Sequence, residues 1–246
     1  MWAGRWRMPD LLTLEGVHTD IAQYHILQGV DLSVPEGGVT MLLGRNGVGK
    51  TTTLRTIMGL WRARAGRIVL DGTDITRLPP SEIARLGIGY VPENMGIFSD
   101  LTVEENMRLA AIGGPVASDR LDWILAVFPP LGTFWRSAAG TLSGGQKQML
   151  SIARAMAEER RLYLIDEPTK GLAPAIVSTM AAALRELKAQ GASILLVEQN
   201  FSVARHLGDT AAAMDDGRIA WSGRMADLAA DAALQSRLLG LSVEGA

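Results

Sequence analysis

A strand-like run, a glycine-rich turn and a helical run follow one another near residue 44, and this order constrains the fold more than any other feature. Val39–Leu43 is apolar, and residues 51–58 have the composition of a helix. The turn between them reads Gly44-Arg45-Asn46-Gly47-Val48-Gly49-Lys50-Thr51. A strand, this glycine and lysine spacing, and a helix together predict a phosphate-binding P-loop. An ordinary glycine-rich turn with an exposed lysine is the alternative.

The chemistry of this loop predicts a nucleoside triphosphate as its ligand. Backbone N–H groups and the positive end of the following helix attract an anion. Lys50 would reach the terminal phosphates, and the Thr51 hydroxyl would ligate Mg²⁺. The candidate nucleotide-binding residues of this segment are Gly44, Arg45, Asn46, Gly47, Val48, Gly49, Lys50, Thr51 and Thr52.

Composition excludes several other classes of protein. The 246 residues carry 24 basic and 26 acidic side chains, a net charge of −2, which gives no electrostatic case for nucleic acid as a partner. Cysteine is absent, so disulfides and thiolate metal sites are excluded. This length suits one large domain or two small ones.

No segment suggests direct insertion into a membrane. Residues 1–9 contain aromatic and basic side chains but no apolar run, which argues against a secretion signal. The longest clean apolar run, residues 194–197, fits a buried strand, whereas a membrane span needs about 20 apolar residues. A membrane role would therefore require a partner.

Apolar periodicity predicts an α/β core with a helical insertion. Period-two alternation over residues 10–34 indicates two antiparallel strands, and strands alternate with helices again after residue 142. Such alternation predicts a mainly parallel sheet. From 93 to about 141 there are helical patterns at 102–111 and 118–128, closed by Pro129-Pro130, but no buried strand.

These patterns predict one domain over residues 10–240, preceded by a tail at 1–9. Its core would comprise residues 10–92 and 150–240, with a helical subdomain at 93–149. Thr102 and Glu105 fit a capping box at the start of the first inserted helix. Asp215-Asp216-Gly217 predicts a hairpin turn and not a metal site.

Two further stretches carry chemistry. The apolar run 162–165 ends in Asp166 and Glu167, where a carboxylate beside a P-loop could hold Mg²⁺ and a second could polarise the attacking water. Leu142-Ser143-Gly144-Gly145-Gln146 places a helix-capping serine before two glycines, which predicts a second anion site. Taken alone, a solvated strand end and a capped surface helix would explain them.

Together these motifs resemble the ATP-binding subunits of ABC transporters over about residues 10–240. In that family residues 44–52 correspond to the Walker A loop, 142–146 to the signature and 162–167 to Walker B. The resemblance implies the ABC ATPase fold, an α/β P-loop NTPase core of the RecA type with an antiparallel β subdomain and an inserted helical subdomain. It also implies ATP and Mg²⁺ as cofactors and ATP hydrolysis coupled to transmembrane transport.

The resemblance further implies a head-to-tail dimer with a second ATP-binding subunit, identical or different. Each ATP would lie between one P-loop and the other subunit's signature, served by Ser143, Gly144, Gly145 and Gln146. Two transmembrane permease subunits and, indirectly, a periplasmic or extracellular binding protein would complete the assembly at the cytoplasmic face of the inner or plasma membrane. Tyr24 stands where the family stacks a ring on adenine; packing in the core is the alternative.

Three positions depart from the general family. Glu93 stands where a glutamine usually contacts Mg²⁺ and the attacking water, and Gln199 replaces a histidine that contacts the γ-phosphate. Glu93 is a harder Mg²⁺ ligand than glutamine but adds negative charge facing the γ-phosphate. Gln199 can donate a hydrogen bond to that phosphate but cannot take up a proton or carry positive charge. We therefore expect Glu167 to dominate hydrolysis, with Glu93 and Gln199 assisting. Lys170 replaces a small or apolar residue and is interpreted as a solvated loop residue near the dimer interface.

Four stretches, residues 90–93, 101–106, 166–174 and 197–200, resemble the LivF-type ATPases of branched-chain amino-acid importers. A closely similar ATPase serves urea uptake. Rival hypotheses are a soluble ABC ATPase of DNA repair or translation, which usually has a coiled-coil insertion or two fused nucleotide domains, and a weakly active regulatory subunit.

Residues 94–101 are the candidate docking surface for the membrane subunits. Ile97 and Phe98 would be its apolar anchors. The alternative is that both side chains simply pack the helical lobe.

Overall fold

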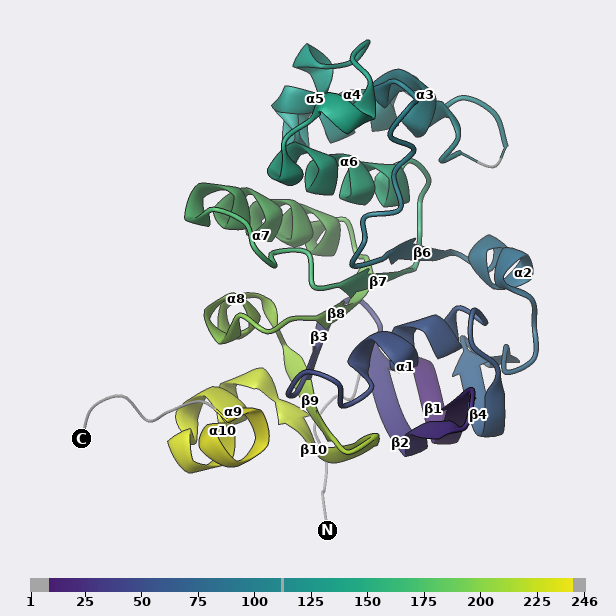
Figure 1. Ribbon diagram of the computed structural model, residues 1–246, viewed down its shortest axis with the longest axis vertical. Coiled ribbons are helices and arrows are strands. Elements are labelled where there is room, and N and C mark those ends of the chain that lie inside the picture. Colours follow the sequence, from purple (N-terminus) through teal and green to yellow (C-terminus); the bar gives the residue numbers. More distant parts are fainter. Residues whose placement is uncertain (1–8, 112, 241–246) are drawn as a thin grey trace.

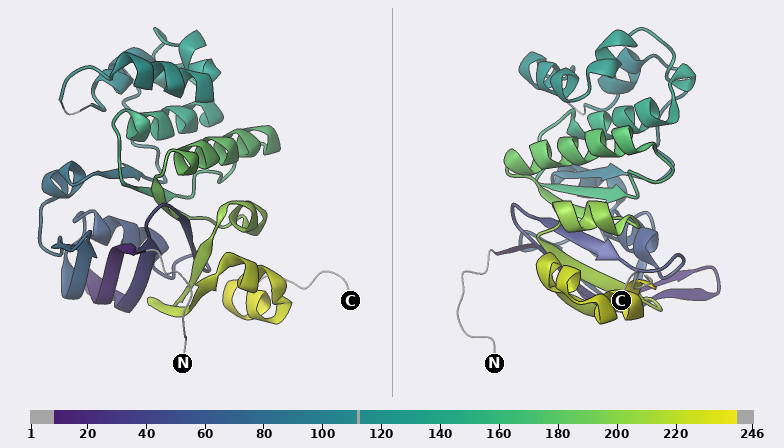
Figure 2. Two further views of the ribbon diagram at one scale, coloured as in Figure 1. Left: turned by 180° about the vertical axis from the view of Figure 1, so that it is seen from behind. Right: turned by 90° about the vertical axis from the view of Figure 1, so that its left-hand side faces the viewer.

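The computed structural model describes residues 9–111 and 113–240, and in it two β-sheets are packed with helices (Figure 1). The predicted tail, residues 1–9, lies outside the described residues except for Pro9. The rear and side views show the same stacking, with the helices of the insertion at one end and the antiparallel sheet towards the other (Figure 2).

The first sheet is antiparallel, in the order β2-β1-β4-β5. Its strands are β1 (Asp10–Ile21), β2 (Tyr24–Pro35), β4 (Ala63–Leu70) and β5 (Thr73–Asp74). Leu12 pairs with Val34 and Leu14 with Leu32, and all four side chains are buried. The two antiparallel strands predicted from alternation are confirmed, since apolar residues at every second position share one face.

The second sheet has the order β10-β9-β3-β8-β7-β6 and is parallel except at β10, as predicted. Its strands are β3 (Val39–Leu43), β6 (Ile88–Val91), β7 (Leu162–Asp166), β8 (Ser193–Val197), β9 (Thr210–Asp215) and β10 (Arg218–Arg224). The turn between β9 and β10 has positive φ at Asp216 and Gly217 (41° and 71°), the backbone that a two-residue hairpin favours.

Successive residues of the parallel strands serve two different hydrophobic clusters. On β3, Leu42 packs with the antiparallel sheet and α1 (Lys50–Ile57), whereas Met41 and Leu43 pack with helices on the opposite face. Both faces of the sheet are therefore covered, which explains why every residue of β3, β7 and β8 is buried and most are apolar.

The insertion contains α3 (Val103–Arg108), α4 (Ser118–Val127), α5 (Pro129–Thr133) and the start of α6 (Gly144–Met156). The capping box of Thr102 and Glu105 is present. The α6 helix runs through the predicted 149/150 boundary, and Leu150, Ile152 and Ala153 on its later half pack with residues of the parallel sheet.

The remaining helices are α2 (Pro80–Arg85), α7 (Pro174–Ala189), α8 (Phe201–Leu207), α9 (Met225–Ala230) and α10 (Ala232–Leu239). Two short helices were not predicted. Pro129-Pro130 was interpreted as the end of a helix, but a new turn of helix starts there, since proline suits the first helical position. The seven-residue α8 is capped by the Asn200 side chain, which accepts a hydrogen bond from Val203 N at 3.3 Å.

A buried asparagine fixes the loop that follows β6. Asn106 is fully buried on α3, accepts a hydrogen bond from Phe98 N at 2.9 Å, and donates from Nδ2 to the carbonyls of Phe98 and Thr102, both at 2.9 Å. One side chain thus replaces the backbone partners that an irregular loop lacks.

We expect Asn106→Ala to lower the free energy of unfolding by about 1–3 kcal/mol, because the backbone groups of the loop lose their buried partner. Thermal or urea unfolding of the purified chain would measure this. Asn94→Ala, an exposed position in the same loop, is the matched control and should change little. Equal stability of the two variants would contradict the assigned role of Asn106.

Candidate functional site

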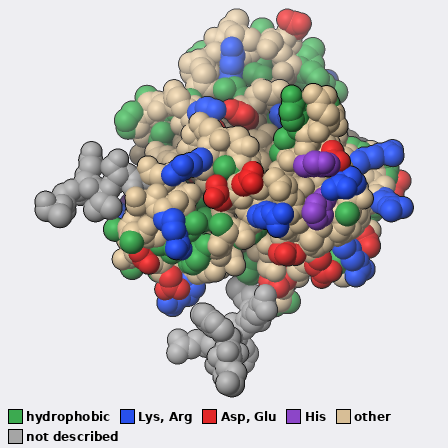
Figure 3. All heavy atoms as spheres, turned by 60° about the horizontal axis from the view of Figure 1, so that its bottom comes forward, with side chains coloured by type: hydrophobic (Ala, Val, Ile, Leu, Met, Phe, Trp, Pro, Cys, Tyr) green, Lys and Arg blue, Asp and Glu red, His purple; other side chains and the backbone are tan. Residues whose placement is uncertain are grey.

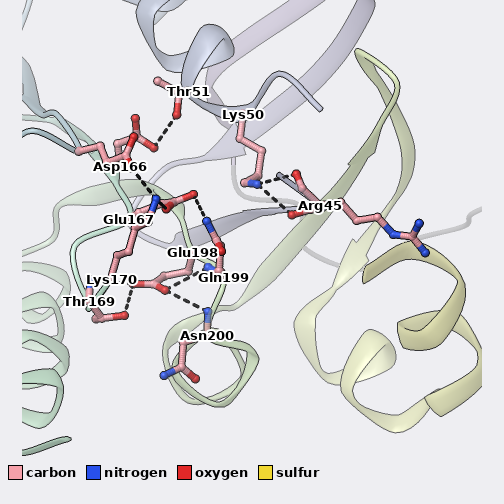
Figure 4. Close-up of polar contacts among 12 residues, drawn as sticks. Arg45, Lys50, Thr51, Asp166, Glu167, Thr169, Lys170, Glu198, Gln199 and Asn200 are labelled. Atoms are coloured by element: carbon pink, nitrogen blue, oxygen red, sulfur yellow. Dashed lines mark hydrogen bonds and ion pairs between the residues drawn. The ribbon is translucent and has the colours of Figure 1, made fainter. Parts of the chain in front are cut away.

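The candidate site forms where parallel strands end at one edge of the second sheet. In register, Leu42 pairs with Val197, Val197 with Asp166, and Ile165 with Val91. The loops that follow β3, β8, β7 and β6 therefore leave the sheet side by side. Figure 4 shows the P-loop beside polar residues at the ends of β7 and β8, and Glu93 after β6 joins them through its ion pair with Lys170.

The P-loop has the tight backbone that its glycines predict. Gly44 has φ +143°, and a Cβ there would lie 2.4 Å from the Met214 carbonyl oxygen on β9. Gly49 caps α1 with φ +110°, and a Cβ there would lie 2.9 Å from Leu27. A side chain at either position would collide with a neighbouring strand, so the loop can pass this close only with glycine.

Lys50 lies inside the loop, 5% exposed, with Nζ donating to the carbonyls of Gly44 and Arg45, both at 2.9 Å. Burial lowers the pKa of Lys50, and the negative charges of Glu167 and Asp166 oppose that shift. The ammonium group is thus held at the centre of the predicted phosphate-binding turn, close to two carboxylates (Figure 4).

Thr51 and Asp166 form the part of the site that fits a magnesium ion. Thr51 Oγ1 donates to Asp166 Oδ1 at 3.2 Å, while Asp166 Oδ2 is buried without a hydrogen-bond partner. Burial raises the pKa of Asp166 to about 6, opposed by the Thr51 hydrogen bond. A buried carboxylate oxygen beside a hydroxyl suits a hard cation that also binds phosphate oxygens. Within residues 9–111 and 113–240, no cluster of three or more His, Asp or Glu side chains could hold a metal unaided.

One carboxylate oxygen of Glu167 accepts a hydrogen bond, and the other lies in an ion pair. Gln199 Nε2 donates to Oε1 at 2.6 Å, and Lys170 Nζ lies 3.2 Å from Oε2. The backbone of Glu167 has φ 48°, in the left-handed region that is costly for a residue with a side chain. The sheet fixes this conformation through the Glu167 N–H, which donates to the Val197 carbonyl at 2.9 Å.

Glu93 lies on the more exposed side of the same group. Its Oε1 accepts a hydrogen bond from Lys170 Nζ at 2.6 Å, so Lys170 joins Glu93 to Glu167. The hydrogen bonds to Glu93 and Glu167 raise the pKa of Lys170 to about 12. Lys170 is an exposed residue in the turn after β7, as interpreted from the sequence, and it also pairs with two candidate site residues.

A buried carboxylate that the sequence analysis did not single out ties two of these loops together. Glu198 is 2% exposed, and its carboxylate accepts four hydrogen bonds. Oε1 accepts from Thr169 N at 3.2 Å and Thr169 Oγ1 at 2.6 Å, and Oε2 accepts from the backbone N–H groups of Gln199 and Asn200 at 3.1 and 3.2 Å. Burial raises the pKa of Glu198, against these hydrogen bonds.

A cavity of about 250 Å³ lies beside the P-loop. Its lining joins the loop to α8 and to the end of α10, through Arg45, Asn46, Phe201 and Leu239. Phe201 and Leu239 were not among the predicted site residues, because only the tertiary structure brings the C-terminal helices next to residue 45.

The signature stretch lies at the start of α6, away from the P-loop of the same chain (Figures 1 and 2). Ser143 caps the helix as predicted, accepting from Gln146 N at 3.3 Å while its own N–H donates to Gln146 Oε1 at 2.9 Å. Ser143 and Gly144 are exposed, whereas Gly145 is buried, and a Cβ there would lie 2.9 Å from Ile176 on α7. Gly145 thus lets two helices pack closely.

Tyr24 begins β2 and is 63% exposed. The alternative of a core tyrosine is therefore excluded, and the ring is free to stack on a ligand. The molecular face in Figure 3 mixes positive and negative side chains without one continuous patch of a single sign, in keeping with the small net charge.

Comparison with known proteins places this geometry in a family. The family model described as "ABC transporter" matches residues 27–170. Two relatives are each 38% identical to this chain. One is the probable branched-chain amino acid transport ATP-binding protein LivF of Archaeoglobus fulgidus, and the match covers 84% of this chain and 89% of that protein. The other is the high-affinity branched-chain amino acid transport ATP-binding protein BraG of Pseudomonas aeruginosa, and the match covers 85% of this chain and 91% of that protein.

A solved structure of an ABC transporter's ATP-binding cassette in its ADP conformation is 26% identical, with a TM-score of 0.79, over 95% of this chain and 100% of that one. The chain therefore belongs to the ABC transporter family, as one of its ATP-binding cassettes. The ABC ATPase fold expected from the sequence is confirmed, and the chain is an ATPase coupled to transport. No helix within the described part of the chain has the length and apolar character needed to cross a bilayer.

We expect Glu198→Gln to destabilise the chain almost as much as Glu198→Ala, by about 1–3 kcal/mol, because three of the four donors are backbone N–H groups that cannot accept from an amide. Urea unfolding would measure the loss. Glu186→Gln makes the same chemical change at an exposed position of α7 and serves as the control. If Glu198→Gln matched the wild type, the four hydrogen bonds would not be needed to hold the two loops.

Proposed function

We propose that this chain energises an importer for branched-chain amino acids. The observation that carries the proposal is the match to LivF and BraG, which extends over most of all three chains. The motifs at 90–93 and 197–200, which contain Glu93 and Gln199, support it, because they resemble those of the LivF-type ATPases. An ATPase of a urea importer remains the alternative from the same subgroup.

Hydrolysis would depend on the residues gathered at the sheet edge. Lys50 would bind the terminal phosphates, and Thr51 with Asp166 would hold Mg²⁺, which neutralises phosphate charge when bound. Glu167 would orient the attacking water and accept its proton. Gln199 is well placed to steady that carboxylate, since its amide already donates to Glu167 at 2.6 Å.

The site would be completed by a second ATP-binding subunit. The P-loop and the signature lie apart within one chain, and Ser143 and Gly144 are exposed at the start of α6. In a head-to-tail pair, each signature could meet the nucleotide on the partner's P-loop. Tyr24, exposed at the start of β2, would cover the base.

The loop at residues 94–101 would receive the permease subunits at the cytoplasmic face of the membrane. Phe98 is 48% exposed and stacks on the Arg154 guanidinium, 4.8 Å from the ring centre, while Ile97 is partly buried. Ser151 Oγ donates to Met95 O at 2.6 Å, so this loop is bound to α6. A displacement of Phe98 would therefore reach the later half of α6, beyond the predicted subdomain boundary at residue 149.

We expect Glu167→Gln to reduce ATP turnover at least 100-fold while ATP binding persists, because the variant loses the general base but keeps the loop. Gln199→His should change the rate far less and introduce a histidine pH dependence that the wild type lacks. Steady-state ATPase assays against pH would measure both. Intact turnover in Glu167→Gln would contradict the roles assigned here.

Transport in proteoliposomes containing the permease subunits would test the cargo and the docking loop together. We expect ATP-driven uptake of labelled leucine and not of urea, and Phe98→Ala should lower uptake several-fold more than it lowers basal ATPase activity. Leu60→Ala, which removes another half-exposed apolar side chain, is the control. Urea uptake would favour the alternative importer, and a chain without ATPase activity, alone or with a second subunit, would favour a regulatory role.

A further inference from the structure

Lys170 makes a three-residue bridge that neither the signature motifs nor the site roles above account for. Its Nζ lies 2.6 Å from Glu93 Oε1 and 3.2 Å from Glu167 Oε2. Lys170 follows β7, whereas Glu93 follows β6, 77 residues earlier. The bridge therefore exists only because the two strands end at the same edge of the sheet.

The charges around the bridge show why a cation is needed here. Glu93, Asp166 and Glu167 bring three carboxylates to the edge that would face a nucleotide's phosphates. The ammonium of Lys50 donates to loop carbonyls and not to these carboxylates. Within residues 9–111 and 113–240, the ion pairs formed by Glu93 and Glu167 are both with Lys170.

We propose that Lys170 is a positioning residue, which neutralises the charge that Glu93 adds and holds Glu93 and Glu167 together facing the terminal phosphate of ATP. Two departures from the general family pattern, Glu93 for glutamine and Lys170 for a small or apolar residue, then form one compensated pair. The proposal rests on the proposed function only in taking ATP as the ligand of this edge.

Loss of Lys170 has a predictable electrostatic consequence. Without it, Glu93 and Glu167 repel each other and also repel an incoming polyanion. ATP carries its additional phosphate towards these carboxylates, so binding of ATP suffers more than binding of ADP. The side chain is 54% exposed, which limits the effect to that of a partly screened pair.

The experiment is a charge cycle on the full chain, with ATP and ADP binding measured by calorimetry in EDTA at low salt. We expect Lys170→Met to weaken ATP binding about 3- to 5-fold and ADP binding less than 2-fold. Lys170→Arg should retain wild-type affinity. The double variant Glu93→Gln/Lys170→Met should return to within about 2-fold of the wild type, because the uncompensated carboxylate is gone.

Lys188→Met is the matched control. Lys188 forms a salt bridge with Asp209 at 2.7 Å, and its side chain is partly exposed (36%, against 54% for Lys170). Neither residue belongs to the candidate site. It should bind ATP like the wild type, and thermal unfolding of every variant would exclude a folding defect. Unchanged ATP affinity in Lys170→Met, a double variant as weak as the single one, or an equal loss in Lys188→Met would each overturn the proposal.

Lys50→Ala separates this inference from the proposed function. Its loss of ATP binding would show that calorimetry reports the P-loop. If the wild-type chain binds ATP but the Glu93→Gln/Lys170→Met double variant binds it as weakly as Lys170→Met, only the proposed bridge is overturned. A wild-type chain that binds no ATP overturns both.

Discussion

The alignment of parallel strands at one sheet edge is the constraint on which the rest of the structure depends. Because β3, β8, β7 and β6 are in register, the loops that leave them are neighbours, although the ends of β3 and β8, Leu43 and Val197, are 154 residues apart in the sequence. This edge carries the P-loop and the candidate metal-binding and catalytic carboxylates, whereas the signature residues lie at the start of α6. The hydrophobic clusters on both faces of the sheet hold that edge rigid, and the chemistry is built on their packing.

Charge at this edge is balanced by three different means. Asp166 is buried, and its Oδ2 has no hydrogen-bond partner, so this oxygen suits a bound cation. Glu198 is equally buried, but four donors from two loops surround it, so it acts as a structural tie. Glu93 and Glu167 share a lysine at the surface. Burial alone therefore does not distinguish a metal-binding carboxylate from a structural one; the nature of its partners does.

The helical insertion connects the edge of the sheet to a distant surface. Residues 94–101 leave β6 directly after Glu93, and they are bound to α3 through Asn106 and to α6 through Ser151. The exposed signature residues begin that same α6 helix, whose buried Gly145 packs on α7. The loop at residues 94–101 thus joins this lobe to the candidate site of its own chain, while Ser143 is exposed and could contact a nucleotide bound to a second subunit. A rigid helix is well suited to link the two.

The sequence by itself determined the P-loop with its flanking strand and helix, the capped helices and the family, because each depends on residues that are close along the chain. Period-two and glycine spacing specify such local structure directly. Only the tertiary structure decided that Glu198 is a tie, that Lys170 bridges Glu93 and Glu167, and that Phe201 and Leu239 line the cavity beside Arg45. Those facts depend on which strand ends become neighbours, and no local pattern encodes that. The short helices α5 and α8 were missed for a related reason: at five and seven residues, packing and not propensity stabilises them.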